Sequence, residues 1–351
     1  RAAKHLLGKC RCDTHALSSS QSESLSHPPT MPIFPGVSAM TAASSSEGIK
    51  LYSPAYYGVC AVGGILSCGL THTMVVPLDI VKCRMQANKN LYSGVINGFR
   101  TMVAKEGAAS LTLGWAPTLV GYSMQGACKF GFYELFKKTF SDAVGEESAE
   151  KYRTFVYLAA SASAELIADV ALCPFEAVKV RVQTTSGFAK GLGDGLPKIL
   201  EAEGVAGLYK GLSPLWARQI PYTMMKFASF EKVVEAIYAN VLSGKKDDYS
   251  KGAQLTVSFA GGYIAGVLCA LVSQPADNMV SKLNSVKSTG STMDAVKKIA
   301  AEMGIVGLFT TGLPARIIMV GTLTGLQWGI YDAFKVSVGL PTTGHVAKKE
   351  E

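Results

Sequence analysis

Residues 77–86 read PLDIVKCRMQ, and the same pattern occurs twice more: residues 174–183 read PFEAVKVRVQ, and residues 275–284 read PADNMVSKLN. The three prolines are spaced by 97 and 101 residues, so one structural unit occurs three times in the chain. An apolar stretch precedes each copy and is long enough to cross a bilayer core, which needs about 20 residues. The pattern therefore predicts three related units, each containing a membrane-spanning helix with a proline near its end.

A second marker lies 57 residues after each proline, where an aromatic residue is followed by an acid: Glu134, Glu231 and Asp332. We predict an all-α membrane protein with six transmembrane helices in three pseudo-threefold-related repeats, plus short amphipathic helices at one face. A proline bends a helix, so three bent helices around one axis can close a cavity. The predicted spans are 54–76, 116–136, 153–173, 214–239, 255–274 and 314–338, and the short helices lie near 94–106, 193–203 and 292–302.

The ends of the chain differ from the repeats in composition. Residues 1–50 are rich in Ser and Pro, and the first twelve contain four basic residues and no acid. That composition is typical of an organelle transit segment, and a disordered tail is the alternative. The resulting organisation is a transit or disordered segment at 1–50, three repeats at 51–148, 149–249 and 250–340, and a polar tail at 341–351.

Composition excludes several classes of function. Only 17% of the residues are charged, whereas soluble domains have about 25%. The net charge of +8 does not indicate nucleic acid, because the basic residues form no stripe with interleaved aromatic side chains. The eight cysteines fit neither a disulfide framework nor a zinc site. The sequence has no Gly-rich phosphate loop, nucleophile elbow or metal motif, so we expect no enzyme, no cofactor and no resident metal.

The repeated charges predict two ion-pair networks, because a carboxylate in an apolar segment needs a partner. Near the prolines, each acid can meet the base of a neighbouring helix, with Gln one turn further bracing the pairs. Val280 stands at the third base position and Lys282 is displaced by two residues, which predicts one weak link. This first network comprises Asp79, Lys82, Gln86, Glu176, Lys179, Gln183, Asp277 and Lys282.

A second network is predicted at the opposite face by Glu134, Lys137, Glu231, Asp332 and Lys335, with Val234 at the position of the missing base. Two networks that cannot both be closed during transport make a two-state gate, and hence alternating access. The alternative is that both sets are static ion pairs at helix ends, which contribute about 0–1 kcal/mol each when exposed.

The Pro-x-Asp/Glu-x-x-Lys pattern, complete in two repeats and with Val280 for Lys in the third, resembles the signature of the mitochondrial carrier family over residues 54–338. The resemblance implies a six-helix bundle in the mitochondrial inner membrane, with both termini in the intermembrane space and the prolines toward the matrix. The first network would then be the matrix-side gate and the second the cytosolic-side gate. The excess of Lys and Arg in the segment after Pro77 agrees with this orientation, since basic loops stay inside. Membrane lipid such as cardiolipin is an expected partner, and the expected functional unit is a monomer.

Polar residues that break the repeat are candidates for binding the substrate. Counting 52 residues from each proline gives Lys129, Lys226 and Gln327 at one membrane depth. Two ammonium groups and an amide around a cavity would receive an oxyanion. The alternative for the two lysines is that they snorkel to the interface. We add four neighbouring side chains to the predicted binding set: Tyr122, Gln125, Tyr222 and Arg218.

Counting back five residues from the first two prolines gives His72 and Asp169, and Glu165 lies one turn from Asp169. Anion binding needs no carboxylates, but proton movement does. Histidine titrates near neutrality, and crowded carboxylates favour taking up a proton. We predict a proton relay made by His72, Glu165 and Asp169; a buried histidine paired with an acid for packing is the alternative.

The segments from Gln125 to Glu134 and from Gln219 to Phe227 resemble the phosphate carrier branch of this family. That resemblance implies phosphate entry into the matrix by proton symport or hydroxyl antiport, with inorganic phosphate and protons as partners. The alternatives are another small anion, copper as a secondary substrate, or a non-transporting proton-leak or scaffold protein on the same fold. A counter-flow assay would separate the anions, and a broken ring of cavity residues would mark a protein that has lost transport.

Overall fold

A computed structural model of the chain describes residues 49–87, 91–185, 187–242, 246–285, 292–310 and 312–344. In this part the chain is helical throughout. The elements are α2 (Pro54–Ala87), α3 (Val95–Glu106), η1 (Ala108–Thr112), α4 (Trp115–Val144), α5 (Glu146–Lys151), α6 (Arg153–Thr184), α7 (Leu192–Tyr209), α8 (Leu212–Asn240), η2 (Lys246–Asp248), α9 (Lys251–Ser285), α10 (Thr292–Thr310) and α11 (Leu313–Ser337).

Six of these helices, α2, α4, α6, α8, α9 and α11, are long enough to span a membrane. The prolines Pro77, Pro174 and Pro275 lie inside α2, α6 and α9, as the repeat predicts. These three helices are apolar enough to be identified as spans from composition alone. The other three are 30, 29 and 25 residues long but carry more charge, because they supply Lys129, Lys226 and the acids of the second marker.

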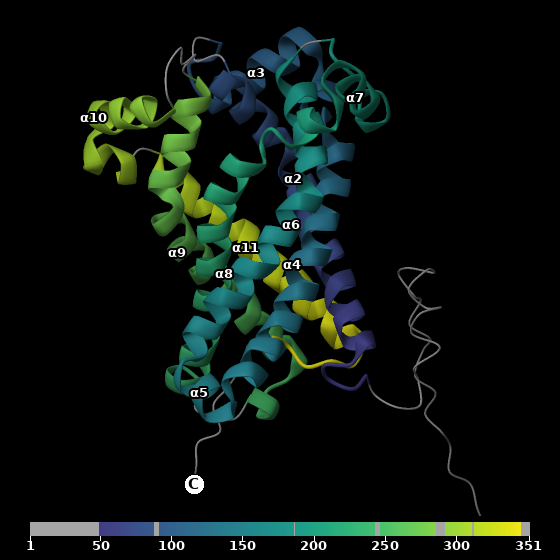
Figure 1. Ribbon diagram of the computed structural model, residues 1–351, viewed down its shortest axis with the longest axis vertical. Helices are drawn as coiled ribbons and strands as arrows, with labels where there is room; N and C mark the ends of the chain where they lie inside the picture. The colour runs from purple at the N-terminus through teal and green to yellow at the C-terminus, as the bar shows by residue number, and fades with distance from the viewer. Residues whose placement is uncertain are drawn as a thin grey trace, which may run out of the picture. The chain divides into compact units, whose positions relative to one another are not determined.

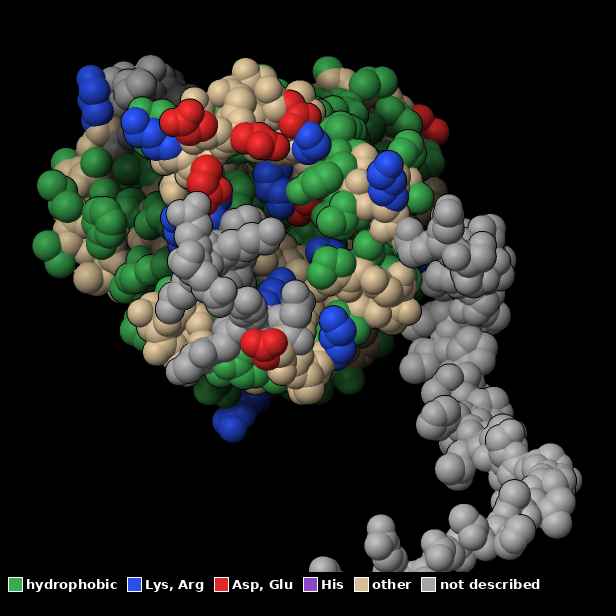
Figure 2. Space-filling model, turned by 90° about the horizontal axis from the view of Figure 1, so that it is seen from below, with side chains coloured by type: hydrophobic (Ala, Val, Ile, Leu, Met, Phe, Trp, Pro, Cys, Tyr) green, Lys and Arg blue, Asp and Glu red, His purple; other side chains and the backbone are tan. Residues whose placement is uncertain are grey.

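The six long helices form a closed bundle (Figure 1). In chain order each packs against the next, and α11 packs back against α2. The short helices α3, α7 and α10 lie at one end of the bundle, which we call the proline end because the three helix prolines lead toward it. The opposite end carries α5, η2 and the start of α2, and we call it the terminal end. Seen from the terminal end, acidic and basic side chains lie side by side over the helix ends (Figure 2).

Equivalent glycines shape the three short connections at the proline end. Gly107, Gly204 and Gly304 follow their prolines by 30, 30 and 29 residues and have φ values of 81°, 65° and 65°. This left-handed conformation is accessible to glycine without a steric penalty. It ends the amphipathic helix in each repeat, so the chain turns toward the next long helix at the same place three times.

Glycines also allow two long helices of the first repeat to cross in backbone contact. A Cβ on Gly64 of α2 would collide with the carbonyl oxygen of Gly126 of α4, and the reverse substitution would collide with the carbonyl of Gly64. In the third repeat, a Cβ on Gly266 of α9 would lie 2.7 Å from the Cα of Gly321 of α11. Small residues are typical of such close crossings in membranes.

We expect Gly64→Ala to destabilise the protein, because the methyl group would push apart two backbones that touch. Overpacking of this kind costs about 1–3 kcal/mol. Gly58→Ala is the matched control, since it lies in the same helix with nothing within 4 Å of its Cβ position. Thermal unfolding of the purified protein in detergent measures both. Equal unfolding temperatures for the two variants would show that the crossing is not tight.

Several predicted residues lie outside what the structure describes. Residues 1–48 of the predicted transit segment and 345–351 of the polar tail are among them, as are the side chains of Gln86, Val280 and Lys282. The weak link predicted at Val280 and Lys282 is therefore addressed below only through the partner of Asp277.

Candidate functional site

A cavity of about 150 Å³ lies between the long helices. The lining includes the exposed Lys82 at the proline end and reaches Lys226 and Gln327, which are 1% and 2% exposed. Six cationic and two acidic side chains line it: Lys82, Lys129, Lys179, Arg218, Lys226 and Arg316, with Asp79 and Asp277. The cavity therefore favours an anion.

The three residues predicted at one membrane depth all line this cavity. The Nζ of Lys226 donates to Oε1 of Gln327 at 2.5 Å, and Nε2 of Gln327 donates to the hydroxyl of Thr71 at 3.3 Å. Lys129 instead forms an ion pair with Glu165 of α6 at 3.0 Å. Both lysines are buried among the helices, which excludes the snorkelling arrangement.

The charges of Lys129 and Lys226 are compensated differently. Lys129 faces a carboxylate, whereas the hydrogen-bonding partner of Lys226 is a neutral amide. Arg218 also lines the cavity and makes no ion pair or hydrogen bond with any other residue that the structure describes. An uncompensated cation in a buried position is costly unless an anion joins it. Lys226, which is fully buried, and the half-buried Arg218 are thus placed to receive one.

The tyrosines of the predicted binding set line the cavity in different ways. The ring of Tyr122 stacks on His72, with centroids 3.7 Å apart, and the Nζ of Lys179 lies 5.3 Å from the same ring. Tyr222 pairs its hydroxyl with that of Thr324 at 3.3 Å. Tyr122 and Tyr222 therefore form part of the wall, with their rings held by neighbouring groups.

The two carboxyl groups predicted for proton movement lie together, fully buried behind Gln125. Its Nε2 donates to Oε1 of Glu165 and to Oδ1 of Asp169, both at 3.0 Å. The Oδ2 atom of Asp169 is buried and has no hydrogen-bond partner within the described segments. His72 lines the cavity but bonds neither acid in that part of the chain. The structure brings Glu165 and Asp169 together and places His72 apart from them.

The predicted network at the proline end is only partly assembled. Lys179 pairs with Asp79 of α2 at 2.5 Å and with Glu176 of its own helix at 3.5 Å. We expected Asp277 to meet the base of a neighbouring proline-containing helix. It pairs instead with Arg316 of α11, which also donates to Ser273 at 2.7 Å. Among the described residues Lys82 has no acidic partner within ion-pair distance.

Gln183 also differs from the expectation that it braces an ion pair. Its Nε2 donates to the carbonyl of Leu113 at 3.3 Å, in the turn before α4. The Nε of Arg84 donates to the backbone carbonyl of Gln183 at 3.0 Å. Gln183 thus fastens the end of α6 to the connection of the first repeat.

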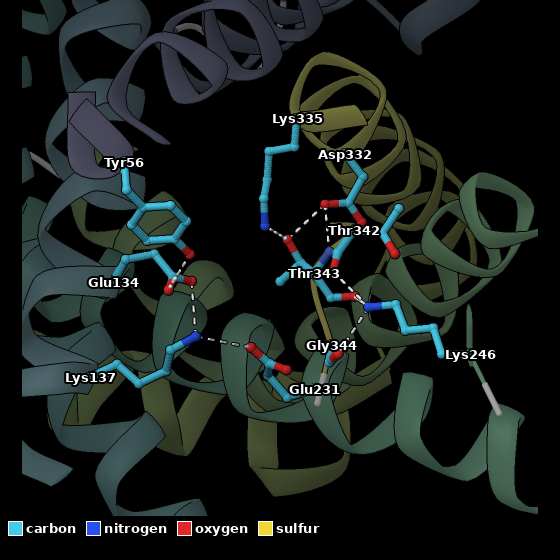
Figure 3. A network of polar contacts seen from close by, with 10 residues as sticks. All are labelled: Tyr56, Glu134, Lys137, Glu231, Lys246, Asp332, Lys335, Thr342, Thr343 and Gly344. Atoms are coloured by element: carbon cyan, nitrogen blue, oxygen red, sulfur yellow. Dashed lines mark hydrogen bonds and ion pairs between the residues drawn. The ribbon is translucent and has the colours of Figure 1, made fainter. Parts of the chain in front are cut away.

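The terminal end of the cavity is closed by aromatic rings and ionic contacts. Phe230 and Trp328 stack with centroids 3.6 Å apart, and each is fully buried. Further out, Lys137 of α4 bridges Glu134 at 2.9 Å and Glu231 of α8 at 3.7 Å, and the hydroxyl of Tyr56 donates to Glu134 (Figure 3). Solute in the cavity can therefore exchange at the proline end and not at the terminal end.

The remaining members of the second network have other partners. Asp332 accepts from the backbone N–H of Thr343 at 2.9 Å and from its hydroxyl at 2.6 Å, and Ser258 donates to the other oxygen at 2.5 Å. Lys335 donates to Thr343 at 3.2 Å, and no acid of the described part lies within ion-pair distance of it. A segment after α11 thus occupies part of the predicted gate.

Sequence reasoning missed the ion pair of Arg316 with Asp277 and the contacts of Thr343. Arg316 had a signal, because it is a lone arginine in an apolar helix with no counterpart in the other repeats. Thr343 had none: a threonine in a polar tail does not indicate which buried acid it meets. In the described segments there is no group of three or more His, Cys, Asp or Glu residues placed to hold a metal ion.

Six spanning helices around a cation-lined cavity, open toward one end and sealed at the other, define a membrane transport protein. A family model described as "Mitochondrial carrier protein" matches residues 53–144, 150–240 and 251–340. The chain belongs to the mitochondrial carrier family, and the three matched stretches coincide with the three helix pairs of the bundle.

Curated relatives carry more specific names. The chain is 64% identical over 302 residues to "Mitochondrial phosphate carrier protein 3, mitochondrial" of Arabidopsis thaliana, covering 86% of the chain and 79% of the relative. It is 56% identical over 305 residues to the "Probable mitochondrial phosphate carrier protein" of Schizosaccharomyces pombe, covering 86% and 97%. It is 55% identical over 286 residues to "Solute carrier family 25 member 3" of Homo sapiens, covering 82% and 77%.

Proposed function

We propose that this chain carries inorganic phosphate across the mitochondrial inner membrane into the matrix. The names of the relatives from Arabidopsis thaliana and Schizosaccharomyces pombe support this substrate. The observation that carries the proposal is the cavity, where Lys226 and Arg218 have no carboxylate partner among the described residues.

The two cations suit a tetrahedral oxyanion in complementary ways. The Lys226 ammonium is a compact point charge at the closed end of the cavity, next to the amide of Gln327. The Arg218 guanidinium can donate two parallel hydrogen bonds to two oxygens of one phosphate. Bound phosphate would therefore offset the positive charge of these two side chains, with Tyr222 beside it on the wall.

The proposal includes coupling to a proton, by symport or by the equivalent hydroxyl antiport. Lys129, Glu165 and Asp169 form one buried cluster with a single positive charge for two carboxylates. One proton makes the cluster neutral. Coupling is useful because the matrix-negative potential opposes entry of an anion. His72, which lines the cavity, would pass the proton between solvent and this cluster.

The gates would work in alternation. In the proposed orientation the proline end faces the matrix, so the structure has its cavity accessible from the matrix and its cytosolic side sealed. The pair of Asp79 and Lys179 is already formed, so closing of the matrix side would bring the remaining helix ends there together, while the bridge from Lys137 to Glu231 would open. A single chain contains the complete cavity, which favours a functional monomer.

The test is uptake of radiolabelled phosphate by proteoliposomes that contain the purified protein. We expect saturable uptake that increases when the lumen is made alkaline relative to the outside, because proton entry with phosphate is then favoured. Parallel vesicles with malate or ATP test the other anions, and vesicles without a pH gradient serve as the control. Saturable malate or ATP uptake with no phosphate uptake would overturn the substrate assignment.

A further inference from the structure

The gate at the terminal end lacks one basic residue. Lys137 and Lys335 each follow the gate acid of their helix by three positions, but the second repeat has Val234 at this place. Lys137 of α4 reaches Glu231 of α8, the gate acid of the next repeat. By the same geometry a base at position 234 would reach Asp332 of α11. Asp332 is fully buried and needs another source of hydrogen bonds.

A short segment after α11, residues Leu340–Gly344, supplies that source, and we call it the strap. Its Thr343 donates twice to one oxygen of Asp332 and accepts from Lys335 (Figure 3). Thr342 and Thr343 are only 4% and 6% exposed, so the strap lies inside the helix ends and not on their surface. The strap thus hydrogen-bonds to Asp332, the acid without a basic partner in the described part of the chain, and to Lys335, which follows this acid in α11.

A lysine outside the bundle axis holds the strap in place. The Nζ of Lys246 in η2 donates to the carbonyls of Thr342 at 2.6 Å, Thr343 at 3.2 Å and Gly344 at 3.1 Å. Thr342 also donates to Oε1 of Gln254 in α9 at 3.2 Å. These contacts bridge α11 to η2 and α9 across the position of the gate.

The missing base leaves the room that the strap needs. Gly344 lies against Val234, and a Cβ on this glycine would be 2.5 Å from Cγ1 of the valine. The φ of Gly344 is 102°, which also favours glycine. A lysine side chain at position 234 would extend into the same space, so the strap and a complete ionic ring exclude one another.

We propose that the strap is a built-in closing element of the terminal-end gate, which substitutes for the absent ion pair at Val234 and must leave when that gate opens. It contacts α8 through Val234, α9 through Gln254 and α11 through Asp332 and Lys335. Opening the gate separates the ends of these helices, so the contacts cannot all persist. The device follows from the gate geometry whatever solute the cavity carries.

A reversible crosslink tests whether the strap must move. The Cβ position of Gly344 is 3.2 Å from Cβ of Val234, slightly below the usual disulfide spacing of about 3.5–4.5 Å. In the variant Val234→Cys/Gly344→Cys, oxidation should form this disulfide and reduce phosphate uptake at least about tenfold, with recovery on reduction. The two single variants control for the native cysteines. Full uptake by crosslinked protein would overturn the proposal.

A second measurement does not depend on the transported solute. Cys60 of α2 is fully buried beside the terminal-end gate, where it packs with Tyr56 and Tyr331. Thr343→Val removes a hydrogen bond to a charged group, so we expect about tenfold faster labelling of Cys60 by a membrane-impermeant maleimide. Thr256→Val, at an exposed site on the same end of α9, is the matched control. Equal labelling of both variants would refute a closing role, independently of any result on phosphate.

Discussion

Replacing Lys226 by glutamine is expected to reduce phosphate uptake by at least about 100-fold while leaving the protein folded. Removing one member of a buried, hydrogen-bonded charge pair costs about 2–5 kcal/mol of binding, which corresponds to tens to thousands in affinity. Lys226 is 1% exposed and its hydrogen-bonding partner is the amide of Gln327. Glutamine keeps most of the length and can still bond that amide, so the change removes mainly the charge.

The same argument predicts an unusual effect on stability. A buried ammonium without a carboxylate is costly to the empty protein, so Lys226→Gln should unfold at the wild-type temperature or above it. Loss of uptake together with retained stability separates a binding role from a structural one. Lys232→Gln on the exposed side of the same helix, where the lysine pairs with Glu235 at 3.7 Å, should leave uptake unchanged. Wild-type uptake by the Lys226 variant would remove it from the binding site.

The fold could be predicted from the sequence because the same pattern of residues occurs in each of the three repeats. Each copy repeats the proline, the acid that follows it and the later acid after an aromatic residue, so chance matches are rejected by the common spacing. The predicted short helix near 193–203 and the kink at Gly204 agree within a residue, since a positive φ at glycine marks the helix end. Repeated spacing of these residues therefore predicts where the helices bend and where they end.

The ring of two lysines and a glutamine could also be predicted, because it follows from counting along equal helices. Lys129, Lys226 and Gln327 all line the cavity as expected. What could not be predicted is the choice of partner at each gate. Asp277 pairs with Arg316, which has a longer side chain than lysine and comes from an adjacent helix. Such choices depend on side-chain reach at a few ångströms, which the spacing of residues along the chain does not specify.

The strap illustrates the same limit at the other gate. Val234 indicated that the network was incomplete, and the repeat shows where the base is missing. It does not show what fills the space, because the residues that do so come from outside the repeat, in a segment with no periodicity. A departure from the repeat thus shows the position at which a partner is missing, and the structure shows which residues occupy that position.

Replacing Asp169 by asparagine is expected to abolish the effect of a pH gradient on phosphate uptake. Asparagine has the shape of protonated aspartic acid, and its oxygen can still accept the hydrogen bond from Gln125. The ion pair of Lys129 with Glu165 then has no net charge, so the cluster no longer needs an added proton. The ratio of uptake with and without an alkaline lumen should fall to about one, whereas exchange of phosphate for phosphate continues.

The companion variants assign the proton to a residue. Asp142→Asn, at an exposed acid near the end of α4, should keep the full effect of the gradient. His72→Ala should slow gradient-driven uptake if the histidine passes the proton to the cluster, but it should not abolish the effect of the gradient as Asp169→Asn does. The opposite outcome, with normal gradient-driven uptake in Asp169→Asn and none in His72→Ala, would move the proton from the carboxyl pair to the histidine. Gln125 lines the cavity and donates to both acids, so either result places proton binding beside the phosphate site. Repulsion between phosphate and an unprotonated cluster would couple phosphate binding to proton binding.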